Sequence, residues 1–333
     1  MQWPPRLKLA NTPTPLTRLE RFSEQLGEVD IWVKHDELTG MEVSGNKIRK
    51  LEFSIAQALE EGCNTLITCG GVQSNHCRAT AILGARLGLR VHLLLRGEQP
   101  ELADGNLLLD CLAGAEVSYI PVRDWEGHAQ VAEQLQQRYR AQGDKAFYIP
   151  VGASDEVGLW GYVAAGQELR QDFDKQGIDP DVIVVATGSG GTQGGLIAGR
   201  ALFDIRAEVV AVNVCDDAAY FARKVSGDLE LWRKRYGIDL DTPSLPINTL
   251  DGYVGPGYGR ADPEIFATIA ELARLEGLFL DPVYTGKAFH GMVSEILKRK
   301  EGRPTALPDG KTLVFIHTGG LFGLFPQKQG FDF

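Results

Sequence analysis

From about residue 46 onward, apolar residues alternate between helical spacing and short continuous runs. Ile48, Leu51, Ile55 and Leu59 recur on one helix face, and the run 65–68 after them indicates a buried strand. The same succession predicts further strands at 91–95, 117–120 and 147–149, a helix carrying Ala81, Ala85 and Leu87, and a helix over 128–141. Helices alternating with runs of valine, isoleucine and leucine are typical of a parallel sheet covered by helices.

A second series of the same kind begins with the run 182–186 and continues with 209–212 and 312–316. The chain is therefore expected to contain two α/β units. The stretch 237–248 carries two prolines and little periodicity, which favours a long connection near a site over a domain boundary.

Composition narrows the class of protein. The 333 residues are 44% hydrophobic and 23% charged, which is ordinary for a soluble chain with two domains or one domain with an insert. The net charge of −10 argues against nucleic acid and anionic membranes as partners. No apolar run approaches the length of about 18 residues that spans a bilayer, and the first residues lack a signal-peptide core, so we expect a cytoplasmic location.

Cysteine spacing gives no sign of a metal or disulfide site. The five cysteines are odd in number and contain no C-x-x-C pair, which favours buried free thiols and no metal; they are Cys63, Cys69, Cys77, Cys111 and Cys215.

A glycine-rich turn is the strongest chemical signal. The apolar run 182–186 leads through TGSGGTQGG (187–195) into an apolar helical pattern. Such a turn directs backbone N–H groups and a helix N-terminus at one anion, and it predicts a phosphate site at Gly188, Ser189, Gly190, Gly191 and Thr192. A dinucleotide motif would need glycine where the chain has Gln193, and no Gly-Lys-Ser/Thr follows for a Walker loop. A ligand with one phosphate fits best.

Two further motifs lie at predicted helix starts. In SGNKIRKLE (44–52), Lys47 would meet a helix N-terminus whose dipole favours a neutral, nucleophilic amine. A lysine in such a basic cluster is more often a surface charge, and the competing Lys34, Lys50 and Lys287 are expected to be surface charges too. In GGVQSNH (70–76), exposed N–H groups are suited to a carboxylate, although Ser74 is equally suited to capping the helix.

Together these motifs and DPVYTGK (281–287) resemble the D-cysteine desulfhydrase and 1-aminocyclopropane-1-carboxylate deaminase family. The resemblance runs from Thr14 to Gly320 with four motifs in the family's order. It implies a pyridoxal-phosphate enzyme of the tryptophan-synthase β-type fold (PLP fold type II), with two three-layer α/β domains and mainly parallel sheets. Residues 1–46 and 160–333 would form the large cofactor-binding domain, and 47–159 a smaller inserted domain.

The resemblance also implies roles for individual residues. It places the Schiff base on Lys47, the phosphate on Gly188–Thr192, the ring hydroxyl beside Asn75, and the substrate near Ser74, Asn75 and His76. Tyr258 and Tyr284 match the two family tyrosines beside the substrate, with Lys47, Ser74 and the tyrosines as the catalytic set. A homodimer acting on a small amino acid is the expected state.

Three positions bear on the substrate or on the fine geometry of the site. Thr285 would face the pyridine nitrogen, where the deaminase branch has glutamate; a neutral hydroxyl leaves the ring a weaker electron sink and favours D-cysteine desulfhydrase. Ser44 and Arg260 depart from the family, and Arg260 is either a cation suited to an acidic substrate such as cysteate or a surface arginine.

The alternatives are L-cysteate sulfo-lyase and 1-aminocyclopropane-1-carboxylate deaminase. From a different class, a non-catalytic or nicotinamide-dependent nucleotide-binding protein would use the glycine turn alone.

Overall fold

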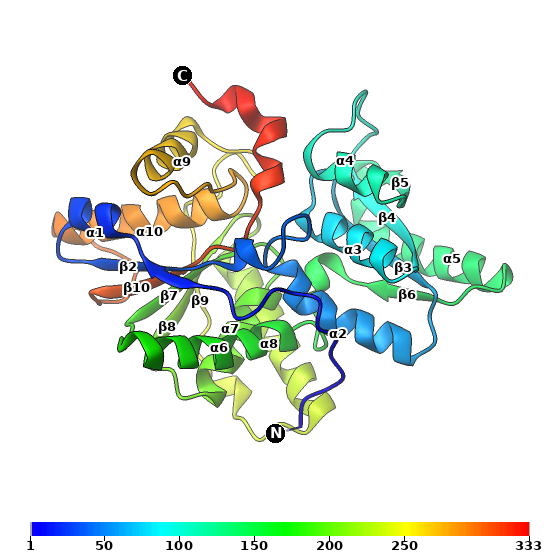
Figure 1. Ribbon diagram of the computed structural model, residues 1–333, viewed down its shortest axis with the longest axis horizontal. Coiled ribbons are helices and arrows are strands. Elements are labelled where there is room, and N and C mark those ends of the chain that lie inside the picture. The colour runs from blue at the N-terminus through cyan, green and yellow to red at the C-terminus, as the bar shows by residue number, and fades with distance from the viewer. Residues whose placement is uncertain (1, 333) are drawn as a thin grey trace.

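The chain folds around two separate, mainly parallel sheets that lie side by side (Figure 1). The computed structural model describes residues 2–332. The six-stranded sheet has the order β1-β2-β10-β7-β8-β9 and the four-stranded sheet the order β5-β4-β3-β6. Two helix-covered sheets confirm the predicted fold class, whereas the domain limits at 46/47 and 159/160 stay a prediction.

The centre of the large sheet is buried on both faces: β7 is buried at all of its positions, and β8 and β10 at all but their first. Its strands are β1 (Leu16–Arg18), β2 (Asp30–Lys34), β7 (Val182–Thr187), β8 (Glu208–Asn213), β9 (Asn248–Leu250) and β10 (Thr312–Ile316). In β7, Ile183 and Val185 face one core, and Val182 and Val184 face the other. All neighbouring strands run parallel except β1, which pairs antiparallel with β2 at the edge.

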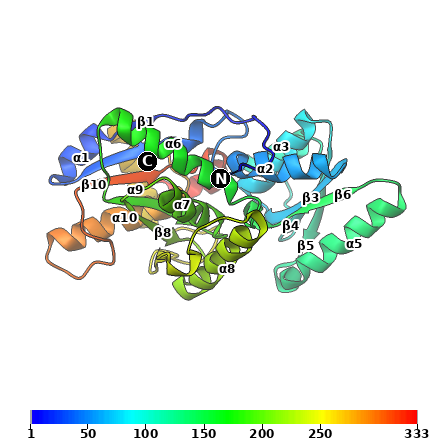
Figure 2. The ribbon, with the colours of Figure 1, turned by 90° about the horizontal axis from the view of Figure 1, so that it is seen from below.

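Helices cover each face of this sheet. One core lies under α6 (Trp160–Gln176), α7 (Gly191–Leu202) and α8 (Ala218–Tyr236), and the other under α1 (Glu20–Leu26), α9 (Pro263–Glu276) and α10 (Thr285–Lys300). Figure 2 shows α6, α7 and α8 together on the side facing the viewer. A three-layer arrangement results, as expected when both faces of a parallel sheet need covering.

The small sheet repeats this plan. Its strands are β3 (Thr65–Gly71), β4 (Arg90–Arg96), β5 (Glu116–Ile120) and β6 (Ala146–Ile149), all parallel. One face packs on α2 (Lys47–Glu60), α3 (Asn75–Arg86) and α4 (Gly105–Leu112), and the other on α5 (His128–Ala141). Among residues 2–332, no helix is both long and apolar enough to cross a bilayer.

Most predicted elements are confirmed, and the three strands that were not predicted share a common feature. The predicted helix 128–141 and strand 312–316 match α5 and β10 to the residue, whereas β1, β2 and β9 were not predicted. These strands are three to five residues long and two lie at sheet edges, so their local pattern is weak. As expected, 237–248 is a long connection, which joins α8 to β9. None of its residues lines the cavity that contains Lys47, but the carbonyl of Asn248 accepts a hydrogen bond from Gln193 of the glycine turn at 3.2 Å.

Helices α6 and α7 approach each other closely through glycines. A Cβ built on Gly166 would lie 2.7 Å from the Cα of Gly199, and one on Gly199 3.0 Å from the Cα of Gly166. The two backbones therefore touch, and no side chain fits between them.

Replacing Gly166 with alanine should lower the free energy of unfolding by about 1–3 kcal/mol, because the helices must separate to admit the methyl group. Gly227→Ala is the matched control: this exposed glycine of α8 has nothing within 4 Å of its built Cβ, so the change should stabilise the helix by about 0.5–1 kcal/mol. Urea unfolding measures both. Equal effects at the two sites would contradict the close packing.

Candidate active site

A cavity of about 420 Å³ opens between the two sheets, at the carboxyl ends of their central strands. Both sheets contribute to its wall: Gly70, Gly71 and Arg96 come from the ends of β3 and β4, while Gly188 and Ser189 follow β7. Ligands in open α/β sheets bind outside the carboxyl ends of the strands, which is where this cavity lies. Lys47, Ser74, His76, Tyr258 and Tyr284 also line it, so the structure brings most of the predicted site residues together.

Lys47 is the first residue of α2 and presents a free amine to the cavity. Within residues 2–332 its Nζ has no hydrogen-bond partner and no ion pair. Desolvation by the surrounding protein lowers the pKa of Lys47 to about 8 from 10.5, and the nearby Cys77 opposes this shift. At pH 7 about a tenth of the amine is then neutral, against less than about a thousandth for an ordinary lysine. Lys47 has the character of a nucleophilic lysine.

The loop before Lys47 is fixed to the large sheet by backbone contacts. Gly45 has φ +107°, and a Cβ there would lie 2.5 Å from the carbonyl oxygen of Thr318, so only glycine fits. The Asn46 N–H donates to that same carbonyl at 3.1 Å, and Asn46 Nδ2 donates to Thr192 Oγ1 at 2.9 Å. Lys47 is thus tied to the glycine turn that follows β7.

That turn has the shape of an anion site. Gly190 caps α7 with φ +83°, and a narrow second cavity is lined by Gly188–Gly190 and Thr192 together with Lys47, Asn75 and Thr187. Thr187 Oγ1 is buried there without a hydrogen-bond partner. A buried hydroxyl without a partner is costly, so its presence beside a helix N-terminus points to a polar ligand.

A buried serine and lysine lie behind the turn. Ser154 Oγ accepts the N–H of Gly191 at 3.2 Å, contacts Ser189 Oγ at 2.8 Å, and accepts a bond from Lys50 Nζ at 3.2 Å. Burial, followed by the charge of Lys47, lowers the pKa of Lys50 well below its usual value. A bound anion would reverse that penalty by supplying a counter-charge.

The prediction that Lys34, Lys50 and Lys287 are surface charges is wrong. All three are at most 1% exposed. Lys34 pairs with Glu168 and Asp172, and Lys287 donates to two backbone carbonyls, so each satisfies its charge inside the protein. The basic cluster at 47–50 lies at an interface between domains, which its sequence alone does not show.

Ser74, Asn75 and His76 open α3 at the far wall. Ser74 Oγ accepts the Cys77 N–H, so the helix-capping interpretation is correct, and Ser74 also lines the cavity. His76 Nε2 lies 2.7 Å from Thr68 Oγ1, whose hydroxyl donates to the Ile149 carbonyl. Nε2 therefore carries the proton, and His76 Nδ1 is left buried without a partner. Burial keeps the pKa of His76 well below its usual range, so the ring is neutral.

Two tyrosines face each other on the large-domain side. The hydroxyls of Tyr258 and Tyr284 are 2.6 Å apart, and their rings meet edge to face with centroids 6.0 Å apart. Burial raises the pKa of both phenols, so both keep their protons at neutral pH. The pair can supply a proton or a hydrogen bond to a group in the cavity.

Thr285 and Arg260 lie outside the cavity wall. Thr285 is fully buried; its hydroxyl donates to Asp281 Oδ1 at 2.7 Å and accepts the Asp281 N–H at 2.8 Å. Arg260 is exposed, so of the two interpretations of this residue the surface arginine is correct.

The cysteines differ in part from the expectation that they are buried free thiols. All five are free, but Cys111 is exposed and Cys215 lines the cavity.

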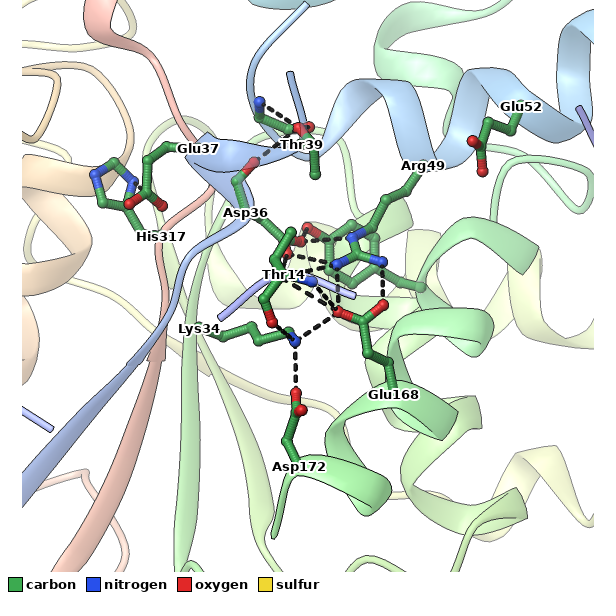
Figure 3. Close-up of polar contacts among 12 residues, drawn as sticks. Thr14, Lys34, Asp36, Glu37, Thr39, Arg49, Glu52, Glu168, Asp172 and His317 are labelled. Atoms are coloured by element: carbon green, nitrogen blue, oxygen red, sulfur yellow. Dashed lines mark hydrogen bonds and ion pairs between the residues drawn. The ribbon is translucent and has the colours of Figure 1, made fainter. Parts of the chain in front are cut away.

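A buried ion-pair network holds the helix that carries Lys47 (Figure 3). Arg49, 1% exposed, donates to both carboxylate oxygens of Asp36 and both of Glu168, at 2.7–3.0 Å. Thr14 and Tyr162 add hydrogen bonds to Asp36 at 2.9 and 2.5 Å. The network joins α2 to the N-terminal segment and α6. Burial raises the pKa of Glu168, but the contacts with Arg49 and Lys34 outweigh this effect and lower that pKa to about 2.

Comparison with known proteins agrees with this geometry. A family model described as pyridoxal-phosphate dependent enzyme matches residues 7–319. The chain belongs to this family. It is 40% identical over 325 residues to a putative 1-aminocyclopropane-1-carboxylate deaminase of Thermotoga maritima, covering 97% of this chain and 99% of the relative. It is 39% identical to the mitochondrial bifunctional D-cysteine desulfhydrase/1-aminocyclopropane-1-carboxylate deaminase of Arabidopsis thaliana, covering 96% and 79%.

A solved structure supports the same assignment. The crystal structure of an ACC deaminase homologue superposes with a TM-score of 0.87 at 34% identity, covering 98% of this chain and 95% of that one. The resemblance inferred from sequence is confirmed: the chain is a pyridoxal-phosphate dependent lyase of the D-cysteine desulfhydrase and deaminase family, with pyridoxal 5'-phosphate as its cofactor. The site fits this cofactor, since a free lysine amine and an anion cradle with an unpartnered hydroxyl line adjoining cavities.

Sequence reasoning missed several residues that line these cavities. They are Arg96, Trp125, Tyr148, Ser154 and Thr187, all of which line one of the two cavities. Arg96 and Thr187 end strands that the pattern did predict, so the rule that sites gather at the carboxyl ends of parallel strands could have found them. Trp125 and Ser154 lie in loops without a motif, and no local signal marks them.

Lys47→Met should stabilise the cofactor-free protein at neutral pH. The pKa of Lys47 is about 8 in the folded protein and about 10.5 in the unfolded chain, so the unfolded chain binds the proton more tightly. The charged lysine therefore lowers the free energy of unfolding, and it does so fully below about pH 8. We expect the variant to gain about 1–3 kcal/mol of unfolding free energy at pH 7. The gain should shrink as pH rises from 8 to 10.5, and urea unfolding across that range checks it. A gain independent of pH would show that the amine is not desolvated.

Arg49→Met should cost about 3–5 kcal/mol of stability, because Asp36 and Glu168 are left as unpaired buried carboxylates. Arg170→Met is the control on α6, since Arg170 forms only a half-exposed i,i+4 pair with Asp174 and should change stability by less than about 0.5 kcal/mol. Chemical denaturation compares the two variants. Similar losses would mean that the network does not stabilise the interface.

Proposed function

We propose that this lyase is a D-cysteine desulfhydrase, which eliminates the β-substituent of D-cysteine to give pyruvate, hydrogen sulfide and ammonia. The observation that carries the proposal is the free Lys47 amine, which shares one cavity with the paired hydroxyls of Tyr258 and Tyr284. The amine is suited to moving a proton at Cα of the substrate, and the tyrosine pair to assisting a group that leaves from Cβ.

The residues that would hold the cofactor follow from the two cavities. Lys47 would bind its aldehyde, and the turn Gly188–Thr192 would bind its phosphate, supported by Ser154. Asn75 lines the narrow cavity and would lie beside the ring hydroxyl; its Oδ1 accepts a bond from Asn106 Nδ2 at 3.0 Å, which fixes its orientation. When bound, the cofactor supplies the electron sink that makes the α-proton acidic.

The residues that line the cavity would then have distinct roles in the reaction. The backbone N–H groups at the start of α3 and the hydroxyl of Ser74 would bind the substrate carboxylate, with His76 beside them. Lys47, with its pKa near 8, can take the α-proton as a neutral amine and hold it as an ammonium while the β-substituent leaves. Tyr258 and Tyr284, whose raised pKa keeps them protonated, can donate to the departing sulfur.

Residue 285 supports the choice of D-cysteine. Thr285 lines neither cavity itself, but it directly follows Tyr284, which lines both, and we propose that it lies near the pyridine nitrogen. A neutral hydroxyl there would not hold the ring protonated as a carboxylate would. Its only proton is directed at Asp281, so it is not available to donate to that nitrogen. Thiolate leaves more readily than a carbon–carbon bond opens, so a weaker electron sink suits a desulfhydrase. The Arabidopsis relative is named for both activities.

We also propose that the protein acts in the cytoplasm as a homodimer. The chain exposes large apolar side chains on and before α4 and near its C-terminal end, namely Leu102, Leu112, Leu321 and Phe325. Apolar surface of this kind is typical of an interface between subunits. Light scattering of the purified protein would report the mass.

A substrate panel tests the function. Supplied with D-cysteine, L-cysteine, L-cysteate and 1-aminocyclopropane-1-carboxylate, the purified holoenzyme should release sulfide and pyruvate fastest from D-cysteine. If the enzyme instead releases sulfite from L-cysteate, or 2-oxobutyrate from 1-aminocyclopropane-1-carboxylate, faster than it releases sulfide, D-cysteine is not its preferred substrate. A protein that takes up no cofactor and releases none of these products would overturn the function itself.

Lys47→Ala should abolish turnover, by at least about a thousandfold, while circular dichroism shows an intact fold. The exposed Lys175, replaced by alanine in the same way, should leave the rate unchanged. Borohydride treatment followed by peptide mapping should locate the cofactor on the peptide that contains Lys47. Cofactor found on another lysine would refute the assignment.

A further inference from the structure

Arg96 is a cation in the cavity wall that belongs to none of the ion-pair networks and is not among the residues proposed to hold the cofactor. It ends β4, directly opposite Gly71 of β3 in the parallel register, and it lines the same cavity as Lys47. Its guanidinium lies 5.2 Å from the ring centroid of Tyr258 and 5.7 Å from that of Trp125. Arg96 thus comes from the small sheet and reaches a tyrosine of the large domain.

No carboxylate neutralises this guanidinium. Over residues 2–332, Arg96 has ring contacts but no ion pair and no side-chain hydrogen bond. Lys224, another cation of the wall, is committed to Asp228 and to the carbonyl of Ser154. The acidic member of the wall, Asp216, is exposed and forms no ion pair with Arg96.

The aromatic contacts leave the donors of Arg96 free. A guanidinium that contacts aromatic rings through its charge still keeps five N–H groups available in its plane. Such a group is suited to an oxyanion or a thiolate, because charge-assisted hydrogen bonds are the strong ones in a partly desolvated site. An unpaired cation of this kind, beside Tyr258, is ready for an anionic ligand.

We infer that Arg96 binds negative charge on the β-substituent of the substrate, so that the enzyme selects amino acids with an anionic sulfur group, thiolate or sulfonate, over neutral ones. The inference rests on the proposed function and deepens it, since it names the property that the β-group must have. The substrate carboxylate is proposed to bind at the start of α3, whereas Arg96 contacts Tyr258, whose ring would also lie 3.3 Å from a Cβ on Gly71. The second anion subsite is therefore on the Tyr258 side.

Aspartate and asparagine test the inference because they have nearly the same shape and differ by one charge. Neither carries a good leaving group at Cβ, so both report binding to the holoenzyme through the absorbance of the cofactor. Each is titrated as the D- and the L-enantiomer. We expect aspartate to bind about tenfold more tightly than asparagine in at least one enantiomeric series.

Arg96→Met should reduce that preference to about one while leaving the dissociation constant of asparagine within about twofold. Arg260→Met is the matched control: it removes one arginine charge close to Tyr258 in sequence, but from an exposed position outside the wall, and should keep the preference. Arg96→Lys keeps the positive charge and should retain part of the preference for aspartate. This variant distinguishes the effect of the charge from the effect of side-chain packing. Isothermal calorimetry of aspartate binding provides a second readout.

Two results would overturn the inference: equal affinities for aspartate and asparagine in the wild-type enzyme, or a preference that persists in Arg96→Met. The first comparison needs no variant, so it stands even if Arg96→Met does not fold. If neither amino acid changes the cofactor absorbance of the wild-type enzyme, amino-acid binding itself is refuted and the proposed function falls with the inference. If asparagine binds and aspartate has no advantage, only the subsite is lost.

Discussion

The buried pairing of Arg49 with Asp36 and Glu168 is the interaction that the site depends on. Arg49 lies two residues after Lys47 on α2, and its guanidinium joins this helix to the N-terminal segment and to α6. Its partners come from positions 13 and 119 residues away in the chain. Because each partner would be an uncompensated buried charge without the others, the arrangement has one well-defined geometry. That geometry fixes where α2 begins, and so where the Lys47 amine lies.

The site combines a rigid interior with walls from both sheets. Gly45, Asn46 and Thr318 hold the Lys47 loop against the glycine turn, and the chain can approach so closely because Gly45 has no side chain. The other walls face each other across the cavity, with Arg96 from the end of β4, Trp125 from the turn after β5, and Tyr258 from the loop between β9 and α9. The contact of Arg96 with Tyr258 thus joins the two halves of the molecule, whereas its contact with Trp125 lies within the half that contains the small sheet.

The charge of the cavity wall is opposite in sign to the net charge of the chain. The chain carries a net charge of −10, yet the cavity wall contains Lys47, Arg96 and Lys224, with Lys50 buried just behind it. Desolvation lowers the pKa of both Lys47 and Lys50, so their ammonium forms are less stable here than in water. A small molecule with phosphate and carboxylate groups fits such a site, whereas a polyanion would be repelled by the outer surface.

The sequence by itself determined the elements with strong local patterns and the motifs that bind through their own backbone. The buried strands β3, β4, β7, β8 and β10, the helix α5, the glycine turn 187–195 and the helix start at Lys47 could all be predicted, because spacing and glycine content act within a few residues. The burial of Lys34, Lys50 and Lys287, the Arg49 network, and the places of Arg96, Trp125 and Ser154 were decided only by the tertiary structure. The reason is physical: a charged side chain is a surface residue unless a partner from a distant segment compensates it, and the local sequence of a lysine or arginine does not contain that partner.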